Sequence, residues 1–163
     1  MKPAASRVQA ALDALGLRRT LIELPVQART SQQAADAVGV DVGQIVKSLV
    51  FIVDGAPVMV VASGVNRVDE RKLATLAGGK VRRADADTVK RATGYTIGGV
   101  PPLGHEMALR IWVDEDLLRH DLIYAAGGVP ECVFPLTPDD LLKATGGTVA
   151  DVKESKSLKG EPT

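Results

Sequence analysis

Apolar residues recur at helical spacing in several segments of the chain, and most of these segments end at a glycine. Val8, Leu12 and Leu15 fall on one face of a helix. Thr30, with Gln33 three residues later, is a capping-box pattern that is typical of the start of a helix. The same reasoning predicts helices or helical turns at residues 4–15, 30–39, 41–44, 69–78, 85–94, 114–119 and 137–146.

Shorter runs of apolar and β-branched residues predict strands. The clearest pair is joined by Asp54-Gly55, because a two-residue hairpin turn needs positive φ at its central residues. The predicted strands are residues 20–24, 48–53, 57–62, 80–83, 109–113, 122–126 and 132–136. Residues 95–108 contain several glycines and prolines, which neither a helix nor an interior strand accommodates, and therefore form a predicted loop.

Strands and helices alternate without the regular spacing of a doubly wound parallel sheet, and hairpins occur beside crossovers. The pattern therefore predicts an α+β fold, a single domain with a mixed β-sheet of about six to seven strands and helices packed around it. We expect this domain to span residues 1–152. The polar residues 153–163 are expected to form a frayed C-terminal tail.

The composition excludes several classes of protein. The chain has 163 residues, one cysteine and two histidines, which leaves no internal disulfide framework and no Cys- or His-rich metal site. We therefore expect no metal and no cofactor. No apolar run approaches the roughly 18 residues of a membrane span, and the N-terminal residues lack the apolar stretch of a secretory signal. The expected localisation is cytoplasmic, with no membrane partner.

Lysine plus arginine equals aspartate plus glutamate at 20 each, but the charge is unevenly distributed. Residues 67–91 carry eight basic and four acidic side chains. Such a patch could contact a few phosphates, although two solvated helix faces would give the same pattern. The neutral total charge argues against a protein that coats nucleic acid by charge alone, and we expect no DNA partner.

Lys47 is the first residue that could carry chemistry. It lies between the apolar pairs Ile45-Val46 and Leu49-Val50, so its ammonium group must either reach solvent or face a pocket. In a pocket, an anionic ligand group would be its natural counterpart. Alternatively, Lys47 lies in the last turn of the short helix and interacts with the helix dipole.

The glycine- and proline-rich loop is the second such feature. Gly98 and Gly99 permit a close approach of the backbone, while Pro101 and Pro102 stiffen the loop and remove two N–H donors. The remaining N–H donors belong to Gly98, Gly99, Val100, Leu103 and Gly104. They could position an ester carbonyl or stabilise an oxyanion. Alternatively, the loop is only a rigid connection between a helix and a strand.

No strong nucleophile motif is present. Cys132 lies in a strand-like run, where a free thiol is usually a small core residue. Ser63-Gly64 lacks the flanking glycine pattern of a nucleophile elbow. His105, beside the loop, could contact a substrate or act as a base, or it could have a structural role.

Taken together, these motifs resemble the YbaK/EbsC family, which is related to the editing domain inserted in bacterial prolyl-tRNA synthetases. The resemblance covers about residues 20–150 and includes Thr30 with Ala34-Ala35, Gln44–Phe51, Asp54-Gly55, Arg67–Asp69, Lys72–Ala74, Thr93–Tyr95, Gly98–Gly104, Val113–Glu115 and Leu136–Leu141. Its specific part is the motif around Lys47 followed by the G-x-x-x-P loop from Gly98 to Pro102.

The resemblance implies the mixed-sheet fold of the prolyl-tRNA synthetase editing domain and a free-standing trans-editing hydrolase. Family members hydrolyse the ester between a wrong amino acid and the terminal adenosine of a tRNA, often tRNA(Pro), as a second sieve after the synthetase. The expected partners are therefore the acceptor end of an aminoacyl-tRNA and prolyl-tRNA synthetase.

The family's motifs also imply roles for matching residues. Lys47 is expected to hold the terminal nucleotide, and the loop to frame the aminoacyl group. The residues implied in catalysis are Lys47, Gly98, Gly99, Val100 and Pro102. Those implied in substrate binding are Ser48, Ser63, Pro101, Leu103, Gly104 and His105, and those in tRNA binding are Arg67, Arg71, Arg82 and Arg83. No general base is evident, so the ribose hydroxyl or amino group of the substrate is expected to activate water.

Several alternatives stay open from the sequence. Members of the family that act on alanyl-tRNA place Asn after the key lysine, whereas Ser48 approaches the small hydroxyl residue of members that act on cysteinyl-tRNA. Alanine, serine, threonine, cysteine or a small non-protein amino acid are all compatible. The chain could also be a non-catalytic module that binds a tRNA end or nucleotide, or an adaptor that docks on a synthetase through the basic segment 67–91.

Overall fold

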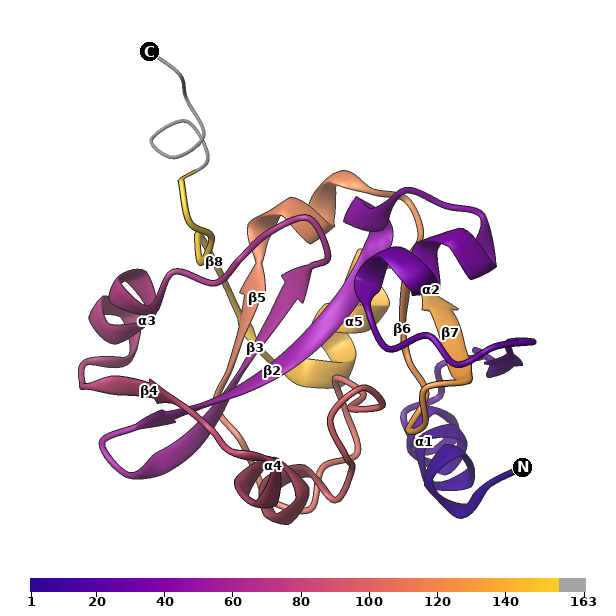
Figure 1. The fold of residues 1–163 in the computed structure, drawn as a ribbon, viewed down its shortest axis with the longest axis horizontal. Helices are drawn as coiled ribbons and strands as arrows, with labels where there is room; N and C mark the ends of the chain where they lie inside the picture. The colour runs from indigo at the N-terminus through magenta and orange to yellow at the C-terminus, as the bar shows by residue number, and fades with distance from the viewer. Residues whose placement is uncertain (156–163) are drawn as a thin grey trace.

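Within residues 1–155, the part of the chain that the structure describes, eight strands form one mixed sheet in this computed structural model (Figure 1). β2 (Ile45–Val53) and β3 (Ala56–Ser63) form an antiparallel hairpin, whereas β3 and β5 (Ile111–Asp114) run parallel. The predicted α+β fold with a mixed sheet is therefore confirmed.

The order of the strands leaves a gap in the sheet. The order is β1-β7-β6-β2-β3-β5-β8, with β4 also paired to β2, and the remaining bounds are β1 (Ile22–Glu23), β4 (Val81–Arg83), β6 (Ile123–Ala126), β7 (Cys132–Leu136) and β8 (Thr148–Ala150). β6 pairs only with the start of β2, at Ile45 and Val46, and β4 only with its end, from Phe51 to Val53. Residues 47–50 thus have a strand neighbour on the β3 side alone.

Helices cover both faces of the sheet. α1 (Pro3–Ala14), α4 (Ala86–Thr93) and α5 (Pro138–Thr145) contribute to the main hydrophobic core on one face. α2 (Ser31–Val38) and α3 (Glu70–Ala77) pack on two smaller apolar clusters and lie far apart, with β2 crossing between them (Figure 1). Two short 3-10 helices, η1 (Val42–Gln44) and η2 (Glu115–Arg119), complete the set.

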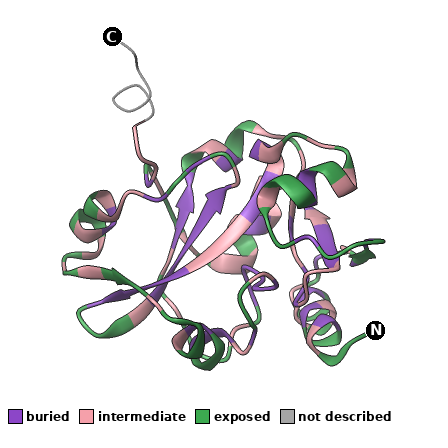
Figure 2. Cartoon of the chain, viewed as in Figure 1, coloured by how far each residue is buried: buried purple, intermediate pink, exposed green. Residues whose placement is uncertain are grey.

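The middle of β2 is less buried than its ends, as Figure 2 shows. Successive side chains of a strand point to opposite faces. Val46 and Val50 therefore belong to the main core, whereas Lys47 and Leu49 face the side on which α2 and α3 lie apart. The functional candidate Lys47 is thus presented between two helices rather than beneath one.

Local signals in the sequence explain where the elements begin and end. Thr30 Oγ1 accepts a hydrogen bond from the Gln33 N–H at 3.1 Å, and Gln33 Oε1 accepts the Thr30 N–H at 3.2 Å, which is the predicted capping box of α2. Asp54 and Gly55 adopt φ of 48° and 85° and form the predicted hairpin turn.

Two expectations about the C-terminal part need correction. β8 is an eighth strand that the sequence pattern does not predict, because its three residues follow a glycine pair and show no alternation. Lys153 and Glu154 are paired rather than frayed: Lys153 forms an antiparallel bridge with Val68, and the Glu154 N–H donates to the Arg67 carbonyl at 2.8 Å. The predicted tail from residue 156 onward lies outside the described residues.

No helix among residues 1–155 is long and apolar enough to cross a membrane.

Candidate functional site

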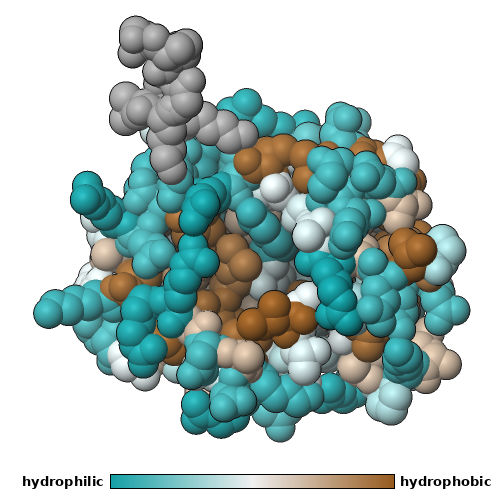
Figure 3. All heavy atoms as spheres, in the orientation of Figure 1, coloured by the Kyte–Doolittle hydropathy of each residue, from teal (hydrophilic) through white to brown (hydrophobic). Residues whose placement is uncertain are grey.

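A cleft of about 700 Å³ lies beside the middle of β2. Its lining comes from segments far apart in the sequence, namely residues 28–34, 45–51, 64–68, 83–89, 97–100 and 124–133. Figure 3 shows apolar side chains gathered in the middle of this face, between hydrophilic ones. The gap in the sheet therefore coincides with a partly apolar cleft, the usual form of a small-molecule site.

The lining of the cleft is positively charged. Its basic residues are Arg29, Lys47, Arg67 and Arg83, and no aspartate, glutamate or histidine is among the described residues that line it. Two of these side chains are ion-paired with acids outside the lining, Arg83 with Glu70 at 3.4 Å and Arg67 with Glu154 at 3.7 Å. The basic groups themselves all lie on the cleft side. Such a cleft attracts an anionic ligand.

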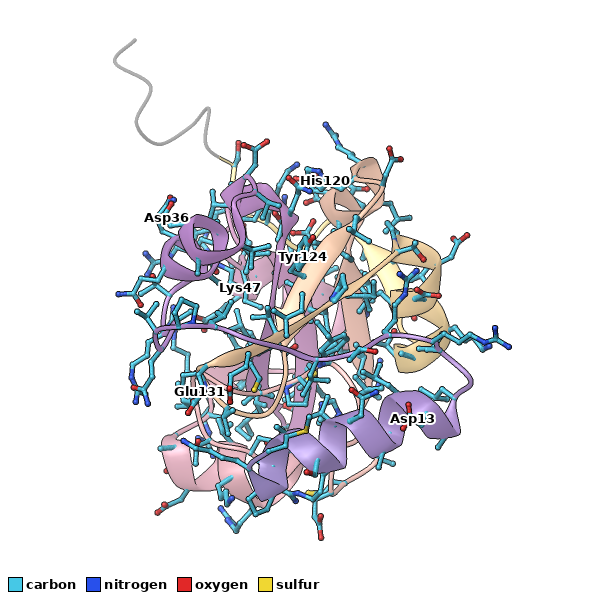
Figure 4. The ribbon with its side chains drawn as sticks, turned by 90° about the vertical axis from the view of Figure 1, so that its right-hand side faces the viewer. Asp13, Asp36, Lys47, His120, Tyr124 and Glu131 are labelled. Atoms are coloured by element: carbon cyan, nitrogen blue, oxygen red, sulfur yellow. The ribbon has the colours of Figure 1, made fainter. Side chains whose placement is uncertain are left out.

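Lys47 is the third residue of β2 and pairs with Ala62 of β3. Its side chain lines the cleft on the same side of the sheet as Tyr124, which lies opposite Ile45 across the parallel strands. Figure 4 shows Lys47 and Tyr124 close together. The alternative that Lys47 ends the short helix is wrong, because η1 stops at Gln44.

Ser48 lines the cleft beside Lys47. Its hydroxyl is buried and makes no hydrogen bond to another described residue. A buried hydroxyl without a partner costs free energy, so a ligand that hydrogen-bonds to Ser48 would remove that cost.

The glycine- and proline-rich loop reaches the cleft through only some of its residues. Gly98 and Val100 line the cleft, whereas Gly99 does not. The Gly99 N–H donates to the Thr96 carbonyl at 3.0 Å, so it is not the available donor that the sequence suggests. The Gly98 and Val100 N–H groups donate to no other residue within 1–155, so both remain available to a ligand.

Close backbone contacts hold this loop in place. A Cβ atom added at Gly99 would lie 2.7 Å from the Gly128 carbonyl oxygen, and one added at Gly128 would lie 2.7 Å from the Ala4 carbonyl oxygen. The His105 ring donates from Nε2 to the Pro101 carbonyl at 2.7 Å. Burial lowers the pKa of His105, which favours the neutral ring that makes this contact.

The cleft therefore gathers some of the expected residues and not others. Lys47, Ser48, Gly98, Val100, Arg67 and Arg83 line it. Gly99, Pro101, Pro102, Leu103, Gly104, His105, Ser63, Arg71 and Arg82 do not. Pro101, Pro102 and Leu103 are buried members of the loop and do not line the cleft.

Ser63 and His105, which the resemblance implies in substrate binding, both make hydrogen bonds to backbone carbonyls. The Ser63 hydroxyl donates to the Gly43 carbonyl at 2.8 Å, so it joins the end of β3 to η1. The hydrogen bond from His105 to Pro101 closes the loop on itself. Both side chains are thus engaged in holding the backbone, and neither lines the cleft.

Residues 26–144 match the family model of the aminoacyl-tRNA editing domain. The chain belongs to this family. The resemblance to the YbaK/EbsC family is thereby confirmed, and the match includes both Lys47 and the Gly98–Pro102 loop.

Known proteins of several kinds are similar to this editing domain. The crystal structure of a candidate trans-editing enzyme for prolyl-tRNA synthetase is 47% identical, with a TM-score of 0.91 over 95% of this chain and 99% of that one. A candidate Cys-tRNA(Pro)/Cys-tRNA(Cys) deacylase, EbsC from Enterococcus faecalis, is 27% identical over 125 residues, 76% of each chain. A proline–tRNA ligase from Maridesulfovibrio salexigens is 34% identical over 90 residues, which are 55% of this chain and 15% of that enzyme.

The cleft of the editing domain also contains residues that sequence reasoning missed. They are Arg29, Asn66, Tyr124 and Cys132. Arg29 reaches the cleft because the strap formed by residues 24–30 runs along the β6–β7 turn, where the Ala28 N–H donates to the Pro130 carbonyl at 2.8 Å. Pairings of this kind join distant segments, and a local pattern does not reveal them.

Cys132 is a core residue, as predicted, although it also borders the cleft. Burial raises the pKa of its thiol. The thiolate is the nucleophilic form of cysteine, so a protonated, buried thiol is a poor nucleophile.

A buried polar network fixes the loop 64–68 at the edge of the cleft. The Asn66 side-chain amide donates to Asp114 Oδ2 and to Asp116 Oδ2, both at 2.8 Å. Lys153 Nζ donates to Asp116 Oδ2 at 2.6 Å, and this contact lowers the pKa of Asp116 and raises that of Lys153. Arg67 follows Asn66 directly, so the network also limits where Arg67 can lie.

Within residues 1–155, no group of three His, Cys, Asp or Glu side chains could hold a metal ion.

Proposed function

We propose that this editing domain acts in trans as an aminoacyl-tRNA deacylase, which hydrolyses the ester between a small, wrong amino acid and the terminal ribose of tRNA(Pro). The observation that carries the proposal is one cleft that brings together Lys47, the Gly98–Val100 loop and three arginines, with no carboxylate among its described lining residues.

The charge and size of the cleft suit the acceptor end of a tRNA. Phosphate groups of the single-stranded end would lie near Arg29, Arg67 and Arg83, and Lys47 would hold the terminal nucleotide. A volume of about 700 Å³ is in the range of sites for drug-sized ligands, which includes a nucleoside with a small aminoacyl group.

The chemistry assigned to the chain is positioning and charge stabilisation. Water adds to the ester carbonyl, and the N–H groups of Gly98 and Val100 stabilise the oxyanion that forms. The bond between the carbonyl carbon and the ribose oxygen then breaks, and the water's proton passes to the ribose oxygen. Because no described lining residue is a carboxylate or histidine, the base is supplied by the ribose hydroxyl or the amino group of the substrate.

The amino acid is proposed to be small. The Ser48 hydroxyl is available to a polar side chain, and the name of EbsC points to cysteine. Alanine, serine and threonine are the other amino acids to test, with a small non-protein amino acid after them. The similarity to a prolyl-tRNA ligase supports tRNA(Pro) as the carrier and that synthetase as a partner.

A panel of mischarged tRNAs tests the proposal. Wild-type protein in excess is mixed with alanyl-, cysteinyl-, seryl- and threonyl-tRNA(Pro), and release of the amino acid is followed against spontaneous hydrolysis. Faster release from at least one ester is the expected result. No acceleration with any of them would contradict the proposal.

The lack of a carboxylate or histidine in the described lining favours one second candidate, a non-catalytic module that binds the tRNA end. That function predicts saturable binding of the same tRNAs with no hydrolysis beyond the spontaneous rate.

A further inference from the structure

Asn66 is one of the polar residues of the cleft that have no role in the scheme above. Asn66 lines the cleft, is only 5% exposed and is the single asparagine of the sequence. Its amide nitrogen has two protons, and these donate to Asp114 Oδ2 and Asp116 Oδ2. The reversed amide would place its oxygen against two carboxylate oxygens, so the neighbours fix its orientation.

With both N–H donors used on the side of the acids, the amide oxygen is the group that Asn66 has left for the cleft. Asp114 is fully buried, and its carboxyl oxygens accept N–H donors from Ser63, Asn66 and Asp116. Besides Asn66, Asp116 contacts two cations: Lys153 Nζ lies 2.6 Å from Oδ2 and Arg119 Nε lies 3.3 Å from Oδ1. A donor bonded to a carboxylate is polarised, which strengthens the acceptor at the other end of the amide.

The substrate has a group that needs such an acceptor. An aminoacyl ester carries an α-ammonium group, whereas the basic residues among the described lining have no acidic lining residue beside them to receive it. Behind Asn66 lies the buried carboxylate of Asp114, to which the Asn66 amide is directly bonded. Asn66 therefore combines an amide oxygen of fixed orientation with the carboxylate of Asp114, which is bonded to the nitrogen of the same amide.

We propose that Asn66 Oδ1 accepts a hydrogen bond from the α-ammonium group of the aminoacyl ester, an assignment that rests on the proposed deacylase function. It makes the site selective for esters of α-amino acids over esters of hydroxy acids. An ammonium group that is held in this way is not a base. The ribose hydroxyl then remains as the substrate group that activates water.

A stable analogue tests this assignment without relying on hydrolysis. tRNA that ends in 3′-amino-3′-deoxyadenosine is acylated through an amide bond with alanine or with lactate, which replaces the ammonium group by a hydroxyl. Wild-type protein is expected to bind the alanyl form about ten- to a hundredfold more tightly, the range of one charge-assisted hydrogen bond. Asn66→Ala is expected to bind both forms equally.

Two further variants guard against a loss of folding. Asn66→Ser retains one O–H donor for the acids but lacks the amide oxygen, and it should also lose the preference. Leu118→Ala alters an apolar residue that is 41% exposed and does not line the cleft, and it should keep the wild-type ratio. In protein labelled with ¹⁵N at asparagine, the only side-chain amide signal should shift more with the alanyl than with the lactyl form.

The assignment is overturned if wild-type protein shows no preference, or if Asn66→Ala and Asn66→Ser keep it. A preference that depends on Asn66 in a protein that cleaves no ester would support the assignment and contradict the deacylase function.

Discussion

At Gly99 the backbone of the loop passes so close to Gly128 that no side chain fits between them. A Cβ atom there would meet the Gly128 carbonyl oxygen at 2.7 Å, and a Cβ atom at Gly128 would meet the Ala4 carbonyl oxygen of α1 at the same distance. The sequence identifies Gly99 as special from its place beside Gly98, but it suggests a substrate contact. In the structure, the reason for a glycine at position 99 is the close packing of this loop on the β6–β7 turn at Gly128.

Gly99→Ala is therefore expected to destabilise the protein by about 1–3 kcal/mol, the usual cost of overpacking. The displaced Gly98 and Val100 N–H groups should also reduce kcat/KM for deacylation at least about tenfold, the scale set by loss of an oxyanion donor. Urea denaturation and deacylation assays measure the two effects.

Gly43→Ala is the matched control, because a Cβ atom there would meet nothing nearer than His120 Nε2 at 3.5 Å, an ordinary contact. Equal stability and activity for Gly99→Ala and Gly43→Ala would contradict the role given to the contact between the two loops.

Among the elements, those with local signals are predictable from the sequence and those that depend on distant pairing are not. The capping box at Thr30 gives the start of α2 and the turn at Asp54-Gly55 gives the end of β2, because each needs only a few neighbouring residues. The start of β2 is predicted three residues too late, at residue 48 instead of Ile45. β8 and the bridge at Lys153 form through pairing with β5 and Val68, which no local pattern specifies. The strap that brings Arg29 to the cleft is missed for the same reason.

The candidate site shows the same division. Lys47, Ser48, Gly98 and Val100 could be found because family motifs mark them, and they do line one cleft. A histidine beside a glycine-rich loop, such as His105, often suggests a catalytic residue. In the structure the His105 ring donates a hydrogen bond to the Pro101 carbonyl, a contact that depends on how the loop folds. Asn66 has no motif signal, and its orientation depends on two acids about 50 residues away in the sequence.

The loop that contains His105 should make the stability of the protein depend on pH. Burial holds the pKa of His105 below its ordinary value of 6.5, so the unfolded chain takes up a proton more readily than the folded one. The free energy of unfolding is therefore expected to fall as the pH is lowered through 6.5. Urea denaturation at pH 7.5 and at pH 5.5 measures this difference.

His105→Gln removes the titrating group and can still donate to Pro101, so its stability should change less between the same two pH values. An unchanged pH dependence in His105→Gln would show that other groups cause it.

For the molecule as a whole, a net charge of zero does not mean that basic and acidic residues are evenly distributed over the surface. The sequence is neutral, yet four basic side chains line the cleft, and the carboxylates paired with two of them, Glu70 with Arg83 and Glu154 with Arg67, lie outside its described lining. The net charge suggests little affinity for a nucleic acid, and this is misleading because the relevant field is local. Binding of the tRNA end should depend on salt through a few phosphate contacts only.

Arg83 and Arg82 separate a cleft contact from general surface charge. Both are exposed and adjacent in β4, but only Arg83 lines the cleft. Arg83→Gln is expected to reduce the slope of log Kd against log salt by about 0.7, the value for one contact to a single strand. Fluorescence anisotropy with labelled tRNA at several salt concentrations gives the slope.

Arg82→Gln should leave that slope nearly unchanged. An equal reduction in both variants would show that the acceptor stem also crosses the outer side of β4, as the expected tRNA-binding role of Arg82 requires.

The most direct test of the whole account is deacylation of the four mischarged tRNAs by wild type, Lys47→Ala and Lys143→Ala side by side. Lys143 lies in α5, away from the cleft lining, and serves as the control for the loss of a lysine. We predict that wild type and Lys143→Ala cleave at least one ester, and that Lys47→Ala loses about 10- to 100-fold in kcat/KM, the value of one charged hydrogen bond. Equal activity of Lys47→Ala and wild type, or no cleavage of any ester, would contradict the account.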